Sequence, residues 1–333
     1  MNTEAVAAAA QALRAGKLVA IPTETVYGLA ADAGNAEAVA AVYALKQRPA
    51  DHPLIVHVSD LAQARRWADF NEQALALAHA FWPGPLTLIA RLRAGMPDSA
   101  CAGHATVGLR VPSHPVAQAL LRQFEALGGL GVAAPSANRF GRISPTRAAH
   151  VLDDYGGEAP LILEGGESEV GLESTICDVS GEHPAVLRPG AITGAAMAAV
   201  LGLPALGGAA ADRPVVPGSL AAHYAPLTRL ELLPAAQLPD RLQAVQAAGQ
   251  RAAVYARQCP AGHHASHWIA MAGQPEALSR HLYDDLRRLD AMHVDVLLVE
   301  QPPADAAYSA INDRLGRART GSMAIPDSSS ARP

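Results

Sequence analysis

Hydroxyl and cationic side chains set in an apolar frame are the most informative feature of the chain. The apolar stretch 18–21 leads directly to Thr23 and Thr25, which predicts a buried strand that ends in a polar turn. Lys46 and Arg48 follow on the next predicted helix. Arginine offers a planar fork to a carboxylate or phosphate, and lysine a compact charge. The pattern favours a pocket for a small anion, although each hydroxyl taken alone also fits a turn or a cap.

Other polar side chains stand where predicted strands end, the usual position of ligands in open α/β sheets. Thr106 and Arg110 are four residues apart on one predicted strand, so they share a face. Because a buried Arg110 needs an anionic partner, a ligand and an internal salt bridge both fit it. The small side chains of 136–144 leave backbone N–H groups free to face a phosphate, although Ser144 also fits a helix cap. Arg188, directly before a Pro-Gly pair, adds a further donor to anions.

Length, charge and cysteine content limit the class of protein. A chain of 333 residues exceeds what one core usually holds, so we expect two domains. Half of the residues are hydrophobic and 17% are charged, which is typical of a globular protein. A net charge of -5 argues against a protein that coats nucleic acid, although it leaves a local basic groove open. Three widely spaced cysteines indicate neither a disulfide framework nor a zinc cluster, and no P-loop motif is present.

The order of predicted elements indicates two α/β units. Helical and strand patterns alternate up to about residue 200, as in an α/β sheet. The stretch 202–219 is rich in glycine and proline, which predicts a linker. A second, smaller and doubly wound unit follows. Its predicted strands are 230–233, 252–256 and 294–299, and its predicted helices are 238–248 and 276–292.

Taken together, these motifs resemble the threonylcarbamoyl-AMP synthases, or YrdC-like proteins, over about residues 5–200. The motifs are Pro22-Thr23-Glu24-Thr25-Val26-Tyr27-Gly28-Leu29, Lys46-x-Arg48-Pro49, Pro53-Leu54, Ser136-Ala137-Asn138-x-x-Gly141-x-x-Ser144, Glu173-Ser174-Thr175-Ile176 and Arg188-Pro189-Gly190. The remainder resembles the longer form of that enzyme, with Pro217-Gly218 and His223-Tyr224 in its linker.

The resemblance implies a fold with two domains and a lid. We expect an N-terminal YrdC-like twisted mixed sheet with flanking helices, and a smaller C-terminal Rossmann-like α/β domain. The expected bounds are 1–202 for the catalytic domain, 203–227 for a linker that acts as a lid, 228–325 for the C-terminal domain and 326–333 for a loose tail.

The resemblance also implies a reaction. L-threonine, bicarbonate and ATP would give threonylcarbamoyl-AMP and pyrophosphate, with Mg²⁺ carried by ATP and no metal ligand from the protein. A separate transferase would then use the product to modify tRNA, with a transient tRNA contact by the synthase itself. Because the chain shows neither a signal peptide nor a membrane span, the expected location is the cytoplasm.

Roles for single residues follow from the same resemblance. Lys46 and Arg48 would be catalytic, acting by charge neutralisation. The expected threonine-binding residues are Thr25, His57, Arg110, Ala134 and Ser174. The expected ATP-binding residues are Arg48, His52, Thr106, Ser136, Asn138, Ser144, Arg188 and Tyr224. The family usually has Asn where this chain has His52, so we expect that contact to survive with an altered pH dependence.

Three alternative functions stay open at this point. A double-stranded RNA- or tRNA-binding module would use the same fold, but the negative net charge argues against it. A related carbamoyl-transfer domain would carry paired zinc-finger cysteines, which the sequence lacks. A catalytically inactive, regulatory paralogue would keep the fold without the activity.

Overall fold

The computed structural model describes residues 2–207, 214, 216–218, 220–260 and 267–323. It divides into two compact units. The N-terminal unit contains Met1–Phe140 and Ser144–Ser219, and the C-terminal unit contains Gly141–Ile143 and Leu220–Pro333. Residues 208–213, 215 and 219 of the predicted linker lie outside the described residues, as does the predicted tail at 326–333.

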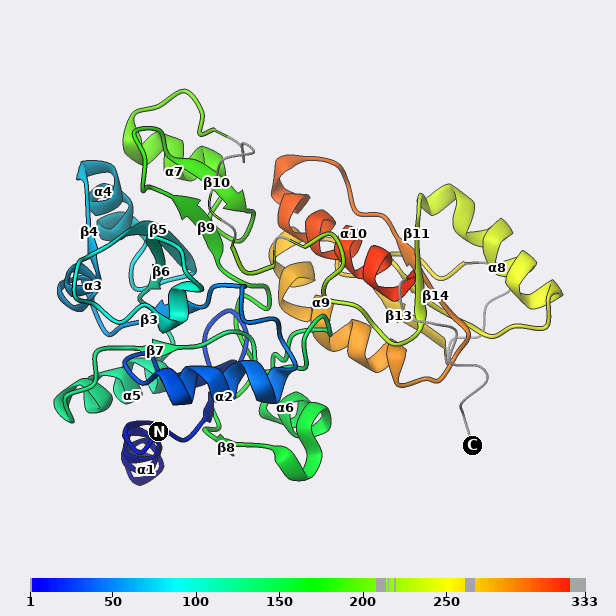
Figure 1. The fold of residues 1–333 in the computed structure, drawn as a ribbon. Helices are drawn as coiled ribbons and strands as arrows, with labels where there is room; N and C mark the ends of the chain where they lie inside the picture. The colour runs from blue at the N-terminus through cyan, green and yellow to red at the C-terminus, as the bar shows by residue number, and fades with distance from the viewer. Residues whose placement is uncertain (1, 208–213, 215, 219, 261–266, 324–333) are drawn as a thin grey trace. The chain divides into compact units, whose positions relative to one another are not determined.

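The N-terminal unit is built on a mixed sheet of ten described strands (Figure 1). Their order is β10-β9-β5-β6-β3-β7-β2-β1-β8, and β4 pairs with β5. The pairs β3–β6, β5–β9 and β1–β8 are parallel, whereas the other pairs are antiparallel. The strands are β1 (Val19–Ile21), β2 (Gly28–Asp32), β3 (Ile55–His57), β4 (Ala68–Asp69), β5 (Leu86–Leu92), β6 (Thr106–Arg110), β7 (Val132–Ala133), β8 (Leu161–Ile162), β9 (Thr175–Asp178) and β10 (Ala185–Arg188). The expected mixed α/β sheet is confirmed.

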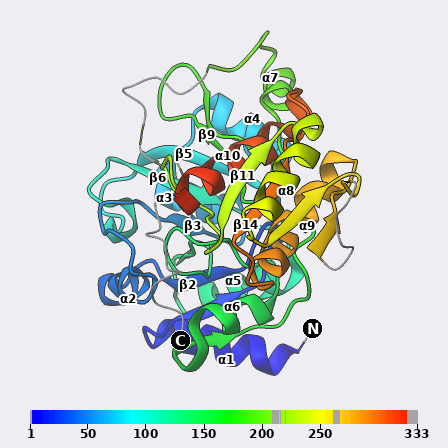
Figure 2. The same ribbon diagram turned by 90° about the vertical axis from the view of Figure 1, so that its right-hand side faces the viewer.

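Helices cover both faces of this sheet. The helices are α1 (Thr3–Arg14), α2 (Ala36–Lys46), α3 (Leu61–Trp67), α4 (Glu72–Phe81), α5 (Pro115–Ala126), α6 (Ala148–Tyr155) and α7 (Gly194–Leu201), with short 3-10 turns at Ser99–Cys101 and Gly156–Glu158. Alternate residues of β1 enter two different apolar clusters, Val19 and Ile21 with α1 and α5, and Ala20 with α2 and α3. Helices α1 and α5 pack side by side (Figure 1 and Figure 2).

Local capping fixes the ends of α2, which carries Lys46. The Asn35 side chain accepts hydrogen bonds from the backbone N–H groups of Glu37 and Ala38, as the sequence predicts. Gln47 ends the helix in the left-handed conformation, with φ 55°. Lys46 is the last residue of this helix, and its side chain is buried.

The first sequence motif forms the turn of a hairpin. Strand β2 pairs antiparallel with β1, with Ile21 opposite Gly28, so the residues between them form the connection. A Cβ atom at Gly28 would come within 3.2 Å of the Cβ atom of Ala134, which explains the small residue there. The sequence patterns did not predict β2, because Gly28–Asp32 contains no β-branched or aromatic residue.

The C-terminal unit has a smaller, fully parallel sheet in the order β11-β14-β12-β13. Its strands are β11 (Arg229–Leu233), β12 (Ala252–Ala256), β13 (Trp268–Ala270) and β14 (Val296–Glu300). Its helices are α8 (Leu238–Ala247), α9 (Pro275–Asp290) and α10 (Ser309–Met323), with 3-10 turns at Ala235–Gln237 and Ala306–Tyr308. Figure 1 shows α8 on one side of this sheet and α9 with α10 on the other, which confirms a Rossmann-like unit. None of the described helices combines the length and apolar character that crossing a bilayer requires.

Candidate active site

A buried arginine organises the first group of predicted site residues. Arg110, the last residue of β6, donates from Nη1 to Oγ1 of Thr25 at 2.8 Å and from Nε to the carbonyl of Gly84 at 3.3 Å. Its Nη2 lies 2.8 Å from Oε1 of Glu24, and the two side chains are 5% and 4% exposed. Of the two partners that the sequence left open, the structure therefore shows the internal salt bridge.

The charges of this pair stabilise each other. Burial by itself raises the pKa of Glu24, but the charge and the hydrogen bond of Arg110 outweigh it and hold that pKa below its usual value. Thr25 is also fixed from its own turn, because its Oγ1 lies 2.8 Å from Oγ1 of Thr23. The hairpin turn thus supplies both a carboxylate and a hydroxyl to one guanidinium group.

His57 lies beside Arg110 as a neutral side chain. It ends β3 and pairs with Arg110 across the parallel β3–β6 ladder. Burial, assisted by the positive charge of Arg110, lowers the pKa of His57 to about 3. Its Nδ1 lies 3.3 Å from the carbonyl of Ile55, which also accepts the backbone N–H of Ala134 at 3.0 Å.

Ser174 and Arg188 form a second buried group. The Oγ of Ser174 lies 2.7 Å from Oγ1 of Thr87. Arg188 donates from Nε and Nη2 to the carbonyl of Ser174, at 3.1 and 2.8 Å, and from Nη2 to its Oγ at 3.2 Å. A further bond runs from Nη1 of Arg188 to the carbonyl of Pro217 at 2.9 Å. These bonds fix Arg188 mainly through neutral carbonyl oxygens.

An apolar strip on the central strands, formed by Ile55, Ile89 and Gly108, separates Thr106 from Arg110. A Cβ atom at Gly108 would come within 3.2 Å of Cδ1 of Ile89 and 3.4 Å of Cγ1 of Ile55. Thr106 and Arg110 share the face of Gly108 and stand about 13 Å apart, because each strand residue advances about 3.3 Å. The strip therefore has a polar residue at each end.

Part of the predicted linker covers this strip. Val216 is buried in one cluster with Ile55, Ile89 and Ile176. Pro217 lines a narrow cavity together with residues of the strip. The lining residues are Pro53, Leu54, Ile55, Ile89, His104, Thr106, Gly108 and Pro217. This described part of the predicted linker therefore packs against the strip.

Lys46 is buried with its ammonium group against the loop that follows β7. Its Nζ donates to the carbonyls of Ser136 at 2.6 Å and Asn138 at 2.5 Å. Burial, together with the nearby charge of Arg48, lowers the pKa of Lys46 well below its usual value. Besides the catalytic role that the sequence predicts, Lys46 therefore has a structural role in holding this loop.

Arg48 and His52 contact one aromatic ring. The guanidinium of Arg48 lies 5.9 Å from the ring centre of Phe140, and its Nη2 donates to the carbonyl of Pro53 at 3.0 Å. His52 packs edge-on against the same ring at 5.7 Å. Partial burial and the charge of Arg48 both lower the pKa of His52, so it is a neutral donor near pH 7.

The remaining residues of the predicted nucleotide loop are bound within the N-terminal unit. Ser144 donates from Oγ to Oε1 of Glu173 at 2.5 Å, and both side chains are buried. Asn138 donates from Nδ2 to the carbonyl of Arg139 at 2.7 Å. Ser136 forms an isolated bridge with Gly28 of the hairpin. The loop is thus tied to the first motif.

Tyr224 belongs to the C-terminal unit. It is only 1% exposed, stacks on Tyr283 at a ring separation of 5.8 Å and lies 5.2 Å below the guanidinium of Arg314. Its φ of 60° is the left-handed region, which a tyrosine rarely adopts. The predicted contact of Tyr224 with a nucleotide stays a prediction.

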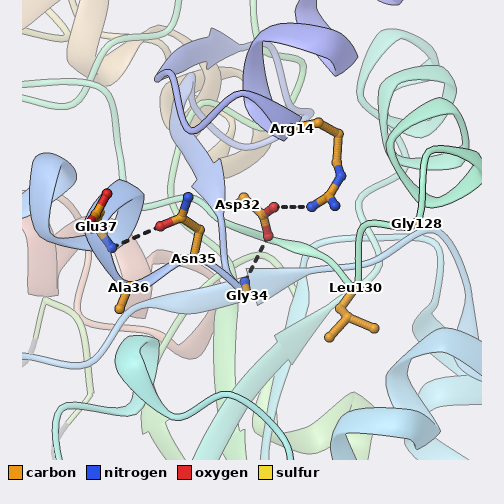
Figure 3. A pocket seen from close by; sticks show the side chains of 8 residues that line it. All are labelled: Arg14, Asp32, Gly34, Asn35, Ala36, Glu37, Gly128 and Leu130. Atoms are coloured by element: carbon orange, nitrogen blue, oxygen red, sulfur yellow. Dashed lines mark hydrogen bonds and ion pairs between the residues drawn. The ribbon is translucent and has the colours of Figure 1, made fainter.

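A hollow of about 620 Å³ elsewhere on the N-terminal unit contains none of the predicted site residues (Figure 3). Arg14 and Asp32 form an ion pair there, and Asp32 accepts the backbone N–H of Gly34 at 2.9 Å. The side chain of Asn35 accepts the backbone N–H of Glu37 at 3.0 Å. Because these polar groups bind one another at the start of α2, we assign no ligand to this hollow.

The structure brings three of the predicted residues, Arg48, Thr106 and Arg188, to one narrow cavity. Arg48 binds the carbonyl of Pro53 and Arg188 that of Pro217, and both prolines line the narrow cavity that Thr106 also lines. Sequence reasoning gave no role to Glu24, Thr87 or Glu173, although each is buried and hydrogen-bonded or ion-paired to a predicted site residue. For Glu24 and Glu173, the only available signal was their place inside motifs.

The chain is similar to proteins of one family along most of its length. The Sua5_yciO_yrdC family model, described as Telomere recombination, matches residues 11–190, and the model Threonylcarbamoyl-AMP synthase, C-terminal domain, matches residues 192–320. The chain is 38% identical to the threonylcarbamoyl-AMP synthase of Bacillus subtilis, covering 96% of this chain and 94% of the relative. That of Pyrococcus abyssi is 36% identical, over 93% and 92% of the two chains. The crystal structure of P. abyssi Sua5 complexed with L-threonine has a TM-score of 0.88 at 33% identity, covering 97% of this chain and 96% of that chain. The chain therefore belongs to the threonylcarbamoyl-AMP synthase family.

Proposed function

We propose that the chain converts L-threonine, bicarbonate and ATP into threonylcarbamoyl-AMP and pyrophosphate. The observation that carries the proposal is the strip with Arg110, Thr25 and His57 at one end and Thr106 at the other, bordered by Arg48 and Arg188. It offers a small polar end for an amino acid and a cationic border for a triphosphate. The full-length similarity to synthases favours the enzyme over the RNA-binding and inactive alternatives.

The Arg110 end is suited to threonine. Arg110 would bind the carboxylate, with Thr25 and Ser174 as neighbouring hydroxyls. His57, neutral because of its low pKa, would act as a hydrogen-bonding group and not as a cation. The N–H of Ala134 is already donated to Ile55, so a contact from Ala134 would use its carbonyl.

The cationic border is suited to the nucleotide. Arg48, Arg188 and Lys46 would neutralise the phosphates, with Mg²⁺ arriving on ATP as part of the substrate. Further contacts would come from His52, Thr106, Ser136, Asn138 and Ser144. Val216 and Pro217 would have to move for the nucleotide to reach the strip, and their return would exclude water from the products.

The chemistry needs positioning more than covalent help. The threonine amine would attack the carbon of bicarbonate and release water, giving a carbamate. A carbamate oxygen would then attack the α-phosphorus of ATP, and pyrophosphate would leave with Mg²⁺. His57 and Glu24 are poor general bases at neutral pH, because both have lowered pKa values. A downstream transferase would use the adenylate to modify tRNA, and we place the reaction in the cytoplasm.

Release of pyrophosphate tests the proposal. The purified chain should release pyrophosphate from ATP only when L-threonine and bicarbonate are both present, and the adenylate should be detectable by mass spectrometry. Omitting each substrate in turn is the control. Pyrophosphate release that does not depend on threonine, or none at all, would contradict the proposal.

A further inference from the structure

We infer that Glu24 is a positioning residue for the amino-acid end, which fixes the guanidinium of Arg110 and balances its charge. The inference rests on the proposed function and deepens it. Glu24 is 3% exposed, and its carboxylate lies 2.8 Å from Nη2 of Arg110. No role for Glu24 follows from the spacing of the motif, because the pair joins a hairpin turn to a strand far along the chain.

The three partners of Arg110 leave the right donors for a carboxylate. A guanidinium has five N–H groups. Among the described residues, the carbonyl of Gly84 accepts from Nε and Oγ1 of Thr25 accepts from Nη1, whereas the carboxylate of Glu24 lies 2.8 Å from Nη2 as an ion pair. Nη1 then keeps one hydrogen, and within the described residues Nη2 makes no hydrogen bond, so both terminal nitrogens can donate to a bidentate carboxylate. Without Glu24 the guanidinium could rotate and offer a different pair of hydrogens.

Charge supports the same role. Glu24 stays ionised at neutral pH, because Arg110 holds its pKa below the usual value. Across the strand pair, His57 is neutral, since its pKa is lowered to about 3. The charges of Glu24, Arg110 and His57 therefore sum to about zero. A neutral end fits an amino acid, which carries both an ammonium and a carboxylate, better than it fits a bare anion.

Two substitutions at Glu24 test this role. Glu24→Gln keeps the shape but removes the charge, and Glu24→Asp keeps the charge but withdraws it by one methylene. We expect Glu24→Gln to raise KM for threonine roughly tenfold or more, and Glu24→Asp to raise it less, with KM for ATP changed by less than about twofold. 3-Hydroxybutanoate is a threonine analogue without the amine. In Glu24→Gln, the affinity for this analogue should rise relative to the affinity for threonine.

Asp32→Asn is the matched control, because Asp32 is another buried carboxylate of the N-terminal unit that is paired with an arginine, Arg14. It should lower thermal stability without changing KM for threonine. An unchanged KM for threonine in folded Glu24→Gln and Glu24→Asp would overturn the inference. So would an equal loss for threonine and ATP, because that result indicates a structural role alone.

The test of Glu24 can be interpreted independently of the test of the proposed function. If the wild-type chain shows no threonine-dependent release of pyrophosphate, the proposed function fails. Calorimetric titration of the same variants with threonine still decides the role of Glu24. Weaker threonine binding in Glu24→Gln than in Asp32→Asn supports the positioning role, and equal binding contradicts it.

Discussion

The two ends of the candidate site hold their cations in different ways. At the amino-acid end, Arg110 is paired with the carboxylate of Glu24. At the nucleotide end, the hydrogen bonds described for Lys46, Arg48 and Arg188 go mainly to backbone carbonyls. A carbonyl oxygen fixes a cation without cancelling its charge, whereas a carboxylate does both. The difference corresponds to the proposed ligands, since an amino acid has no net charge and ATP is strongly anionic.

Burial affects the ionisable groups at the two ends in different ways. Burial favours the neutral form of a group unless an opposite charge is near. Glu24 and Arg110 stay charged inside the protein because they are partners, while His57 becomes neutral beside them. Burial, together with the nearby charge of Arg48, lowers the pKa of Lys46 well below the usual value, although its Nζ donates to two carbonyl oxygens. An incoming triphosphate would bring negative charge to Lys46.

Replacing Lys46 should impair the use of ATP without affecting threonine binding. We expect this substitution to have the largest effect on activity. Lys46→Met removes a positive charge and leaves the carbonyls of Ser136 and Asn138 without their donor. We expect kcat/KM for ATP to fall by about a hundredfold. Threonine binding measured without ATP should hardly change. Lys17→Met is the control, because Lys17 is exposed, and an equal loss of threonine binding in Lys46→Met would contradict the separation of the two ends.

Filling the apolar strip between the two ends of the site should have a smaller effect on the kinetics with ATP. Gly108→Val places a branched side chain where a single Cβ atom already meets Ile89 at 3.2 Å and Ile55 at 3.4 Å. We expect KM for ATP to rise roughly tenfold, because the strip is narrowed, and the melting temperature to fall as neighbours are displaced. Pyrophosphate-release kinetics and thermal unfolding measure both. Unaltered kinetics with ATP would show that the nucleotide does not use the strip.

The smallest expected effect concerns how the free energy of unfolding depends on pH, and it follows from the neutral state of His57. With its pKa lowered to about 3 in the folded chain, His57 takes up a proton in the unfolded chain first, at its ordinary value near 6.5. Its contribution to stability is therefore constant above about pH 6.5 and is lost as the pH falls toward about 3. Denaturant unfolding of His57→Gln should show a flatter loss of stability in this range than the wild type. Parallel curves would mean that His57 is not buried as a neutral group.

Local signals made much of the fold predictable from sequence. Asn35 caps α2 through its own side chain, and the alternation along Leu86–Leu92 marks β5 without help from distant residues. The hairpin strand Gly28–Asp32 could not be predicted in this way, because its small residues have low strand propensity and its pairing with β1, β7 and the loop after β7 supplies the structure.

The same division holds at the site. Residue types identified Arg110, Thr25 and Ser174 as polar groups at strand ends, and the structure joins Arg110 to Thr25 by a hydrogen bond. The partnership of Arg110 with Glu24 joins positions 86 residues apart in the chain (110 − 24), and no local pattern reports such a contact. Nor does a pattern show that the Lys46 ammonium turns inward, because helix propensity is the same for either direction.

Salt dependence tests the contrast between the two ends most directly. We would measure calorimetric dissociation constants of L-threonine and of Mg²⁺-ATP for the wild-type chain at about 0.05 M and about 0.5 M salt, a range over which the screening length of exposed charges shrinks several-fold. The cationic side chains of Lys46, Arg48 and Arg188 predict that ATP binding weakens severalfold, while threonine binding at the neutral Glu24–Arg110 pair changes by less than about twofold. Equal weakening of both ligands would contradict the account.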